Sequence, residues 1–188
     1  MGHVPVRKTD MNLLDFALTI GKLKKLRRTG WVRYGIPDSE SVAEHIFRLA
    51  TLTMFLANMV GVDSDKSLKM ALIHDLGEAT IGDIVTRRGK KLLPNTKQKQ
   101  EDERAALEAI LSLVDAQEYT ALFDEYEGQQ TKEAKFVYQL DKLEMAIQAY
   151  EYEKEHGVNL EEFFESAHSV IHDNNLLDIL SEIEKLRK

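Results

Sequence analysis

Cysteine is absent from the 188-residue sequence, and proline and glycine are scarce, with 3 and 10 copies respectively. Without cysteine, the chain has no disulfide scaffold, no thiolate zinc site, no iron–sulfur cluster and no cysteine nucleophile. Any bound metal must therefore be held by nitrogen and oxygen ligands. The scarcity of proline and glycine, which disfavour helix interiors, favours a mainly helical fold.

Long hydrophobic runs are also missing. The longest apolar stretch, from Ala50 to Val60, is interrupted by polar residues and is shorter than the roughly 20 residues that span a bilayer. The first nine residues contain no long apolar core, so we expect no secretory signal. These features predict a soluble, cytoplasmic protein that makes no membrane contact.

Positive charge is in the minority, because 25 Lys and Arg residues face 32 Asp and Glu residues and leave a formal net charge of −7. A chain with this charge repels nucleic acid, so we expect no nucleic-acid partner. One basic segment lies between residues 86 and 97. It either steers or covers an anionic substrate or is a solvated surface loop, and its cations are Arg87, Arg88, Lys90, Lys91 and Lys97.

Helical periodicity runs through nearly the whole chain, and no segment alternates convincingly as a strand would. Ser41 and Glu44 have the spacing of a capping box, Gly61 can end that helix, and Asp10 can cap an earlier one. We expect loops over residues 27–40 and 86–97, and further helices over residues 41–60, 64–75, 98–114, 117–126, 132–155, 160–171 and 175–187. The pattern predicts one all-α domain over residues 1–188.

Four polar residues are predicted on the inward faces of three of these helices: His45, His74, Asp75 and Asp141. Burying a lone carboxylate among apolar residues is unfavourable by several kcal/mol unless a cation or hydrogen-bond donors compensate it. Two imidazoles and two carboxylates can form a mixed nitrogen and oxygen site for a divalent metal, with positions left for water. Taken singly, each could equally be a hydrogen-bonded core histidine or a capping carboxylate.

The order of these residues resembles the H…HD…D signature of the HD-domain phosphohydrolases. Longer segments resemble the branch of that family formed by the 5′-deoxynucleotidases and the HD domain-containing protein 2 group. They are residues 28–31 (RTGW), 40–45 (ESVAEH), 71–83 (ALIHDLGEATIGD) and 133–142 (EAKFVYQLDK). The resemblance extends from about residue 14 to about residue 164, and we expect the C-terminal helices over 160–187 to pack on this region.

The resemblance implies an HD-domain helical bundle with its metal site between core helices. It also implies a metal-dependent phosphomonoesterase that hydrolyses deoxynucleoside 5′-monophosphates. Asp75 and Glu78 would be catalytic, with Glu78 beside the attacking water as acid, base or orienting group. The ligands of one divalent metal (Mn, Co, Ni, Fe or Mg) would be His45, His74, Asp75 and Asp141. Some relatives hold a second ion, which here would use Glu78, Asp83 and the carbonyl of Ile84.

For the substrate, the resemblance assigns phosphate and sugar recognition to Arg28 and Trp31, and the sugar 3′-hydroxyl to Asp83. In the bacterial pattern an arginine directly precedes the tryptophan, but here Gly30 takes that place and Arg33 follows two residues after Trp31. Which arginine meets the phosphate therefore stays open. From the residues alone, Trp31 equally anchors its loop to the core, and Glu78 is equally a solvated residue beyond a helix end.

Two other functions remain open. One is an HD phosphohydrolase acting on another nucleotide, either a diester or a triphosphate, and the other is a non-catalytic metal-binding HD module. A homodimer is expected because members of the family dimerise, although the surplus apolar helix faces could equally belong to the core.

Overall fold

The computed structural model describes residues 8–85, 87–93 and 96–187, so the expectation for the N-terminus falls largely outside it, as do Thr86 and Pro94 of the basic segment. The described elements are α1 (Lys8–Ile20), η1 (Gly21–Lys24), α2 (Thr29–Arg33), α3 (Val42–Val60), α4 (Ser64–Ile73), α5 (Glu78–Ile81), β1 (Arg87–Arg88), β2 (Lys91–Leu92), α6 (Thr96–Ser112), α7 (Glu118–Gly128), α8 (Lys132–His156), α9 (Glu161–Val170) and α10 (Asn174–Arg187). The predicted all-α class is confirmed. Within these described ranges, no helix has the length and apolar character that crossing a membrane requires.

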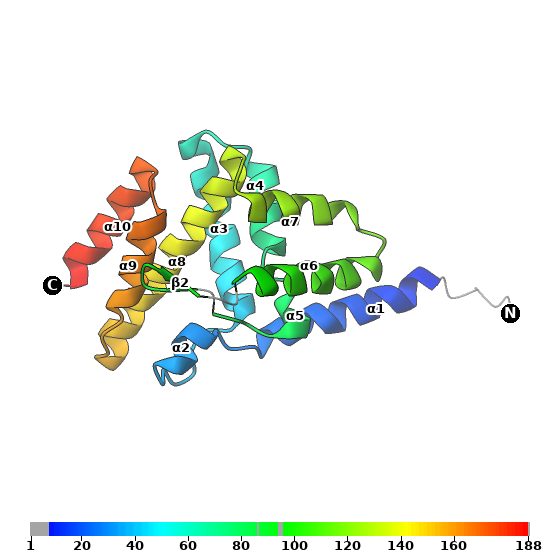
Figure 1. Cartoon of the computed structure of the whole chain (residues 1–188), viewed down its shortest axis with the longest axis horizontal. Helices are drawn as coiled ribbons and strands as arrows, with labels where there is room; N and C mark the ends of the chain where they lie inside the picture. The colour runs from blue at the N-terminus through cyan, green and yellow to red at the C-terminus, as the bar shows by residue number, and fades with distance from the viewer. Residues whose placement is uncertain (1–7, 86, 94–95, 188) are drawn as a thin grey trace, which may run out of the picture.

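The longest described helix, α8, organises the fold. It packs against α3 and α4, against α7, and against the C-terminal pair α9 and α10. In Figure 1, α9 and α10 lie on one side of α8, whereas α1, α6 and α7 lie on the other. Buried apolar residues of α8 such as Leu140 and Ala146 join one core with residues of α3, α4, α9 and α10. Polar residues on the inward face of α8 are thereby brought next to α3 and α4.

The ends of α3 follow the predicted pattern. Ser41 accepts a hydrogen bond from the backbone N–H of Glu44, and the Glu44 carboxylate accepts one from the backbone N–H of Ser41 at 2.6 Å, which completes a capping box. Gly61 follows the helix with φ +77°, a conformation that favours glycine. These caps fix the register of α3 and place His45 in its buried first turns.

Several short elements differ from the prediction. The region expected to be a loop over 27–40 contains α2, and α5 follows α4 after a turn. The basic segment contains a two-stranded antiparallel hairpin, in which Arg87 pairs with Leu92 around Gly89. Helix α1 begins at Lys8, so Asp10 lies inside its first turn and is not the cap. Elements of one turn or two residues are too short to show periodicity and depend on tertiary contacts.

Candidate metal centre and adjoining pocket

Three segments bring the four predicted metal ligands together: α3 carries His45, the turn after α4 carries His74 and Asp75, and α8 carries Asp141. The Nε2 atom of His45 lies 3.2 Å from Oδ1 of Asp141 and 3.4 Å from Nε2 of His74. Nε2 of His74 lies 3.1 Å from Oδ2 of Asp75. All four side chains are buried.

The Nδ1 atom of each histidine has a hydrogen-bond partner outside the cluster. Nδ1 of His45 lies 2.6 Å from a carboxylate oxygen of Glu144, and Nδ1 of His74 lies 2.9 Å from the carbonyl oxygen of Ala71. Both oxygens can only accept, so each Nδ1 carries the hydrogen and each Nε2 turns toward the cluster. This arrangement is typical of metal-ligating histidines.

The centre of this cluster requires a positive charge. Burial and Arg28 lower the pKa of His45, but Glu144 and Asp141 raise it by more, so that the net pKa is about 10. The raised pKa shows that the carboxylates around His45 stabilise a positive charge at its ring. Ligand atoms of His45, His74 and Asp141 lie within 4.8 Å of one another, and Oδ2 of Asp75 adjoins both imidazoles at 3.1 and 3.8 Å. This mixed nitrogen and oxygen donor set fits a divalent metal in place of a proton at His45.

Glu144 was not predicted as a functional residue, yet it is fully buried and supports the centre. One of its carboxylate oxygens holds His45, and the other accepts from Nε of Arg48 at 2.8 Å. The signal that could have found it is its spacing, because it follows Asp141 by three residues and so shares its face of α8. The hydrogen-bonded chain Arg48–Glu144–His45 orients the imidazole of His45, a predicted metal ligand.

We expect the substitution Glu144→Gln to weaken metal affinity by about 10- to 100-fold, which is the usual cost of losing a partner that orients a ligand. The amide presents an N–H where the carboxylate accepted a bond from Arg48 or His45, so the imidazole loses its fixed orientation. Calorimetric Mn²⁺ titration of chelator-treated protein measures the change. Glu151→Gln, which alters an exposed partner of Arg48, is the matched control. Equal affinities for the two variants would contradict the role of Glu144.

Two cations lie against the ligand carboxylates. Arg28 donates to Oδ2 of Asp75 at 3.0 Å and lies 4.0 Å from Oδ1 of Asp141, while Nζ of Lys142 lies 2.7 Å from Oδ2 of Asp141. Burial raises the pKa of Asp75, but His74 and Arg28 lower it by more, so its pKa falls below the usual range. The ligand carboxylates are therefore ionised at neutral pH.

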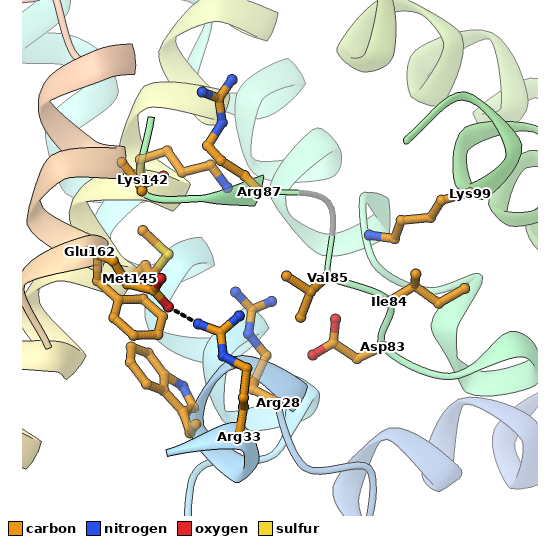
Figure 2. Close-up of a pocket in the computed structure, with 15 residues that line it drawn as sticks. Arg28, Arg33, Asp83, Ile84, Val85, Arg87, Lys99, Lys142, Met145 and Glu162 are labelled. Carbon is orange, nitrogen blue, oxygen red and sulfur yellow. Dashed lines mark ion pairs between the residues drawn. The ribbon is translucent and has the colours of Figure 1, made fainter. Parts of the chain in front are cut away.

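A pocket opens beside this centre, between α2, the segment 83–85, the hairpin, α6, α8 and α9, and it encloses about 110 Å³ (Figure 2). Cations from four of these elements line it: Arg28, Arg33, Arg87, Lys99 and Lys142. Arg33 forms an ion pair with Glu162, drawn as the dashed line in Figure 2, whereas Arg28 contacts the ligand carboxylates. Of the two candidate arginines, Arg28 is the one at the metal centre.

Trp31 and Asp83, predicted to contact substrate, both have structural partners. Trp31 is 1% exposed, stacks on Phe163 with ring centroids 4.2 Å apart and donates from Nε1 to Glu40. The structure thus shows the core-anchoring role of Trp31, although its ring also lines the pocket. Asp83 accepts from the backbone N–H of Thr29 at 2.6 Å and so ties α2 to the segment after α5. Ile84 lines the pocket beside it.

Glu78 is 2% exposed, which corrects the alternative of a solvated residue beyond a helix end. One carboxylate oxygen lies 3.3 Å from Nζ of Lys99, and the other is buried with no hydrogen-bond partner among the described residues. Burial, together with Asp75 and Asp83, raises the pKa of Glu78 well above its usual value. The surroundings of Glu78 thus favour its protonated form more than solvent would, beside the Asp75 carboxylate.

The helical bundle gathers two imidazoles and the Asp141 carboxylate, with Asp75 adjoining them, beside a cation-lined pocket, which is a donor set suited to a divalent metal. The family model described as HD domain matches residues 20–180. The chain belongs to the HD domain family, which confirms the resemblance found in the sequence.

Individual relatives agree with this assignment. The 5′-deoxynucleotidase HDDC2 of Danio rerio is 36% identical over an alignment of 181 residues that covers 94% of this chain and 88% of the relative. A solved structure of a conserved hypothetical protein from Pyrococcus furiosus has a TM-score of 0.73 at 40% identity and covers 92% of this chain and 99% of its own. The structure of a predicted metal-dependent phosphohydrolase from Magnetospirillum magnetotacticum has a TM-score of 0.70 at 26% identity and covers 100% of this chain and 96% of its own.

Proposed function

We propose that this chain is a metal-dependent phosphomonoesterase that hydrolyses deoxynucleoside 5′-monophosphates to deoxynucleoside and phosphate. The observation that carries the proposal is that the buried acid Glu78 and a cation-lined pocket lie beside the His45, His74 and Asp141 cluster and the adjoining Asp75. The names of the curated relatives, 5′-deoxynucleotidases in vertebrates and Dictyostelium discoideum, supply the reaction and the substrate class.

His45, His74, Asp75 and Asp141 would hold the divalent metal, which we propose to be Mn, Co, Ni, Fe or Mg. When bound, such a metal polarises phosphoryl oxygens and lowers the pKa of water toward neutrality. Glu144 and the Ala71 carbonyl keep both imidazoles turned toward it. Lys142 and Arg28 keep the carboxylate ligands ionised and in place.

The substrate phosphate would lie between the centre and the cations of the pocket. Arg28 is suited to this task because its planar guanidinium can share donors between Asp75 and a phosphate oxygen. Lys142 also borders the pocket and adds positive charge on the other side of Asp141. These fixed cations offset the negative charge that grows on the phosphoryl oxygens in the transition state.

The leaving 5′-oxygen needs a proton, and Glu78 would supply it. Burial close to Asp75 and Asp83 raises the pKa of its carboxyl well above the usual value, which favours the form that can donate a proton. A positioned acid of this kind contributes about 10²- to 10⁴-fold to the rate of a proton-transfer step. Asp83 would accept from the sugar 3′-hydroxyl, and Trp31 would form the pocket wall against the sugar.

Phosphate release tests the proposal directly. Chelator-treated protein is supplied with Mn²⁺, Co²⁺, Mg²⁺ or no metal and given each of the four deoxynucleoside 5′-monophosphates and the matching ribonucleotides. We expect metal-dependent release from the deoxynucleotides and little from the ribonucleotides. If metal binds but no monophosphate is hydrolysed, the function is wrong, and diesters, triphosphates and a non-catalytic binding role become the alternatives to test.

Deoxynucleotides are intracellular metabolites, so the function is consistent with a cytoplasmic location.

We also propose that the chain forms a homodimer through the outer face of α3. Large apolar residues on this face are exposed: Phe47 by 73%, Met54 by 47%, Phe55 by 67% and Met59 by 64%. Positions 47 and 54 are seven residues apart and positions 55 and 59 are four apart, so they form two adjacent exposed rows, and an apolar stripe of this kind is characteristic of an interaction surface. Two copies of α3 related by a two-fold axis would bury the stripe against itself.

Substitution Phe55→Glu is expected to convert the dimer into a monomer, because it places two charges in the self-complementary surface. Size-exclusion chromatography with light scattering measures the mass. Leu186→Glu, at a residue 59% exposed on α10, is the control and should leave the dimer intact. A monomeric wild-type protein would disprove this interface.

A further inference from the structure

A second acidic cluster adjoins the metal centre and shares one residue with it. Carboxylate oxygens of Asp75, Glu78 and Glu103 lie within 4.8 Å of one another. The three residues are 8%, 2% and 4% exposed, respectively. Three buried carboxyl groups so close together repel one another unless positive charge lies among them.

Lys99 supplies that positive charge. Its Nζ lies 3.3 Å from Oε1 of Glu78 and 2.9 Å from Oε1 of Glu103, while Asp75 has Arg28 as its own partner at 3.0 Å. Lys99 and Glu103 are four residues apart on α6, so the helix itself fixes that pair. Figure 2 shows Lys99 reaching from α6 toward the segment that carries Asp83 and Ile84. Its ammonium therefore bridges α6 and the start of α5.

The backbone of α5 approaches that of α6 closely at Gly77, which brings Glu78 near Lys99 and Glu103. A Cβ atom at Gly77 would lie 2.7 Å from the backbone carbonyl oxygen of Glu103, so only glycine lets the start of α5 lie directly on α6. Glu78 is the next residue, and this close approach sets its distance from Lys99. One Glu78 oxygen remains buried without a hydrogen-bond partner among the residues described.

We propose that Lys99 is the resident cation of this cluster: its ammonium takes the place that a second divalent ion would need, holds Glu78 beside the metal centre and limits the site to one metal ion. The inference rests on the metal centre of the proposed function but not on the identity of the substrate. It argues against a second ion held by Glu78, Asp83 and the Ile84 carbonyl, because an ammonium already contacts Glu78 and would repel that ion.

Counting bound metal tests this role without an activity assay. Full-length, chelator-treated protein is titrated with Mn²⁺ by calorimetry, and the bound ions per chain are counted by elemental analysis after desalting. We expect one ion in the wild type and in Lys99→Arg, which keeps the charge. Lys99→Met should bind a second, weaker Mn²⁺, because the carboxylates then lack a cation. Lys135→Met, at an exposed position on α8, is the matched control and should bind one ion.

A double variant keeps the test informative if Lys99→Met alone does not fold. The double substitution Lys99→Met with Glu103→Gln removes the ammonium and one carboxylate together, so we expect it to fold and to bind one ion. A Lys99→Met protein that folds only with Mn²⁺ in excess supports the proposal, since the metal then replaces the ammonium. Two ions in the wild type, one ion in a folded Lys99→Met protein, or a Lys99→Met protein that stays unfolded in excess Mn²⁺ would overturn it. If the metal counts are as expected but no deoxynucleotide is hydrolysed, the proposed function is wrong and the role of Lys99 stands.

Discussion

Substitution Asp141→Asn is expected to abolish measurable metal binding and to lower phosphate release by about 1,000-fold. A bound metal contributes several kcal/mol to the stabilisation of a phosphoryl transition state, and each 1.4 kcal/mol corresponds to a tenfold change in rate. Asp141 supplies one of the two predicted carboxylate ligands, and its Oδ1 lies 3.2 Å from Nε2 of His45. Asparagine has nearly the same shape, so the packing of α8 should be preserved while the ligand charge is lost.

The measurement combines Mn²⁺ titration with steady-state phosphate release at saturating Mn²⁺. Thermal unfolding is a second readout, because a ligand that binds only the folded state raises its stability, and this increase should vanish in the variant. Asp178→Asn, at an exposed position of α10, is the control and should behave as the wild type. A variant at Asp141 that keeps both its metal and its turnover would remove this residue from the ligand set.

Substitution Glu78→Gln is expected to reduce turnover by about 10²- to 10⁴-fold while leaving one metal ion bound. Glutamine fills the same buried space beside Lys99 but has no acidic proton to give to the 5′-oxygen. The effect should fall on kcat, because proton donation matters in the transition state and contributes little to substrate binding. Steady-state kinetics and metal counting on the same preparation measure both quantities.

The control for this variant is Glu127→Gln, another partly buried glutamate near the cluster that makes no contact with the pocket beside Arg28. It should retain most of the wild-type turnover. Unchanged kcat in Glu78→Gln would exclude Glu78 as the proton donor. Such a result, combined with no hydrolysis by the wild type, would instead support a metal-binding module without catalysis.

The sequence was sufficient for the features that depend on local spacing. The capping box of Ser41 and Glu44 predicted where α3 begins, and the structure has it there. The longer helices follow from periodicity and were predicted to within a few residues at their ends. That His45, His74, Asp75 and Asp141 lie together was implied mainly by the resemblance to the H…HD…D signature, and their ligand atoms are close in the structure.

Features that depend on distant partners could not be predicted. Glu144 holds His45 from 99 positions away in the sequence, and Lys99 reaches Glu78 from a different helix. Charged residues on an amphipathic helix are usually solvated, so the spacing of Glu144 from Asp141 indicates a shared helix face but not the distant partners of either Glu144 or Lys99. The short helix α2 was not predicted for a related reason. Its five residues are too few to show helical periodicity, and the hydrogen bond from Thr29 to Asp83 stabilises it.

The Arg48–Glu144–His45 chain begins at the protein surface, and that position has a thermodynamic consequence. Arg48 and Phe47 line a groove on the outer side of α3, together with Glu40, Gln148 and Tyr152. Phe47 also belongs to the exposed stripe proposed to meet a second copy of the chain. An association that moves Arg48 would change how firmly Glu144 holds His45, and binding equilibria linked in this way are reciprocal. If two copies associate through this stripe, the factor by which association changes metal affinity equals the factor by which bound metal changes the affinity between the copies.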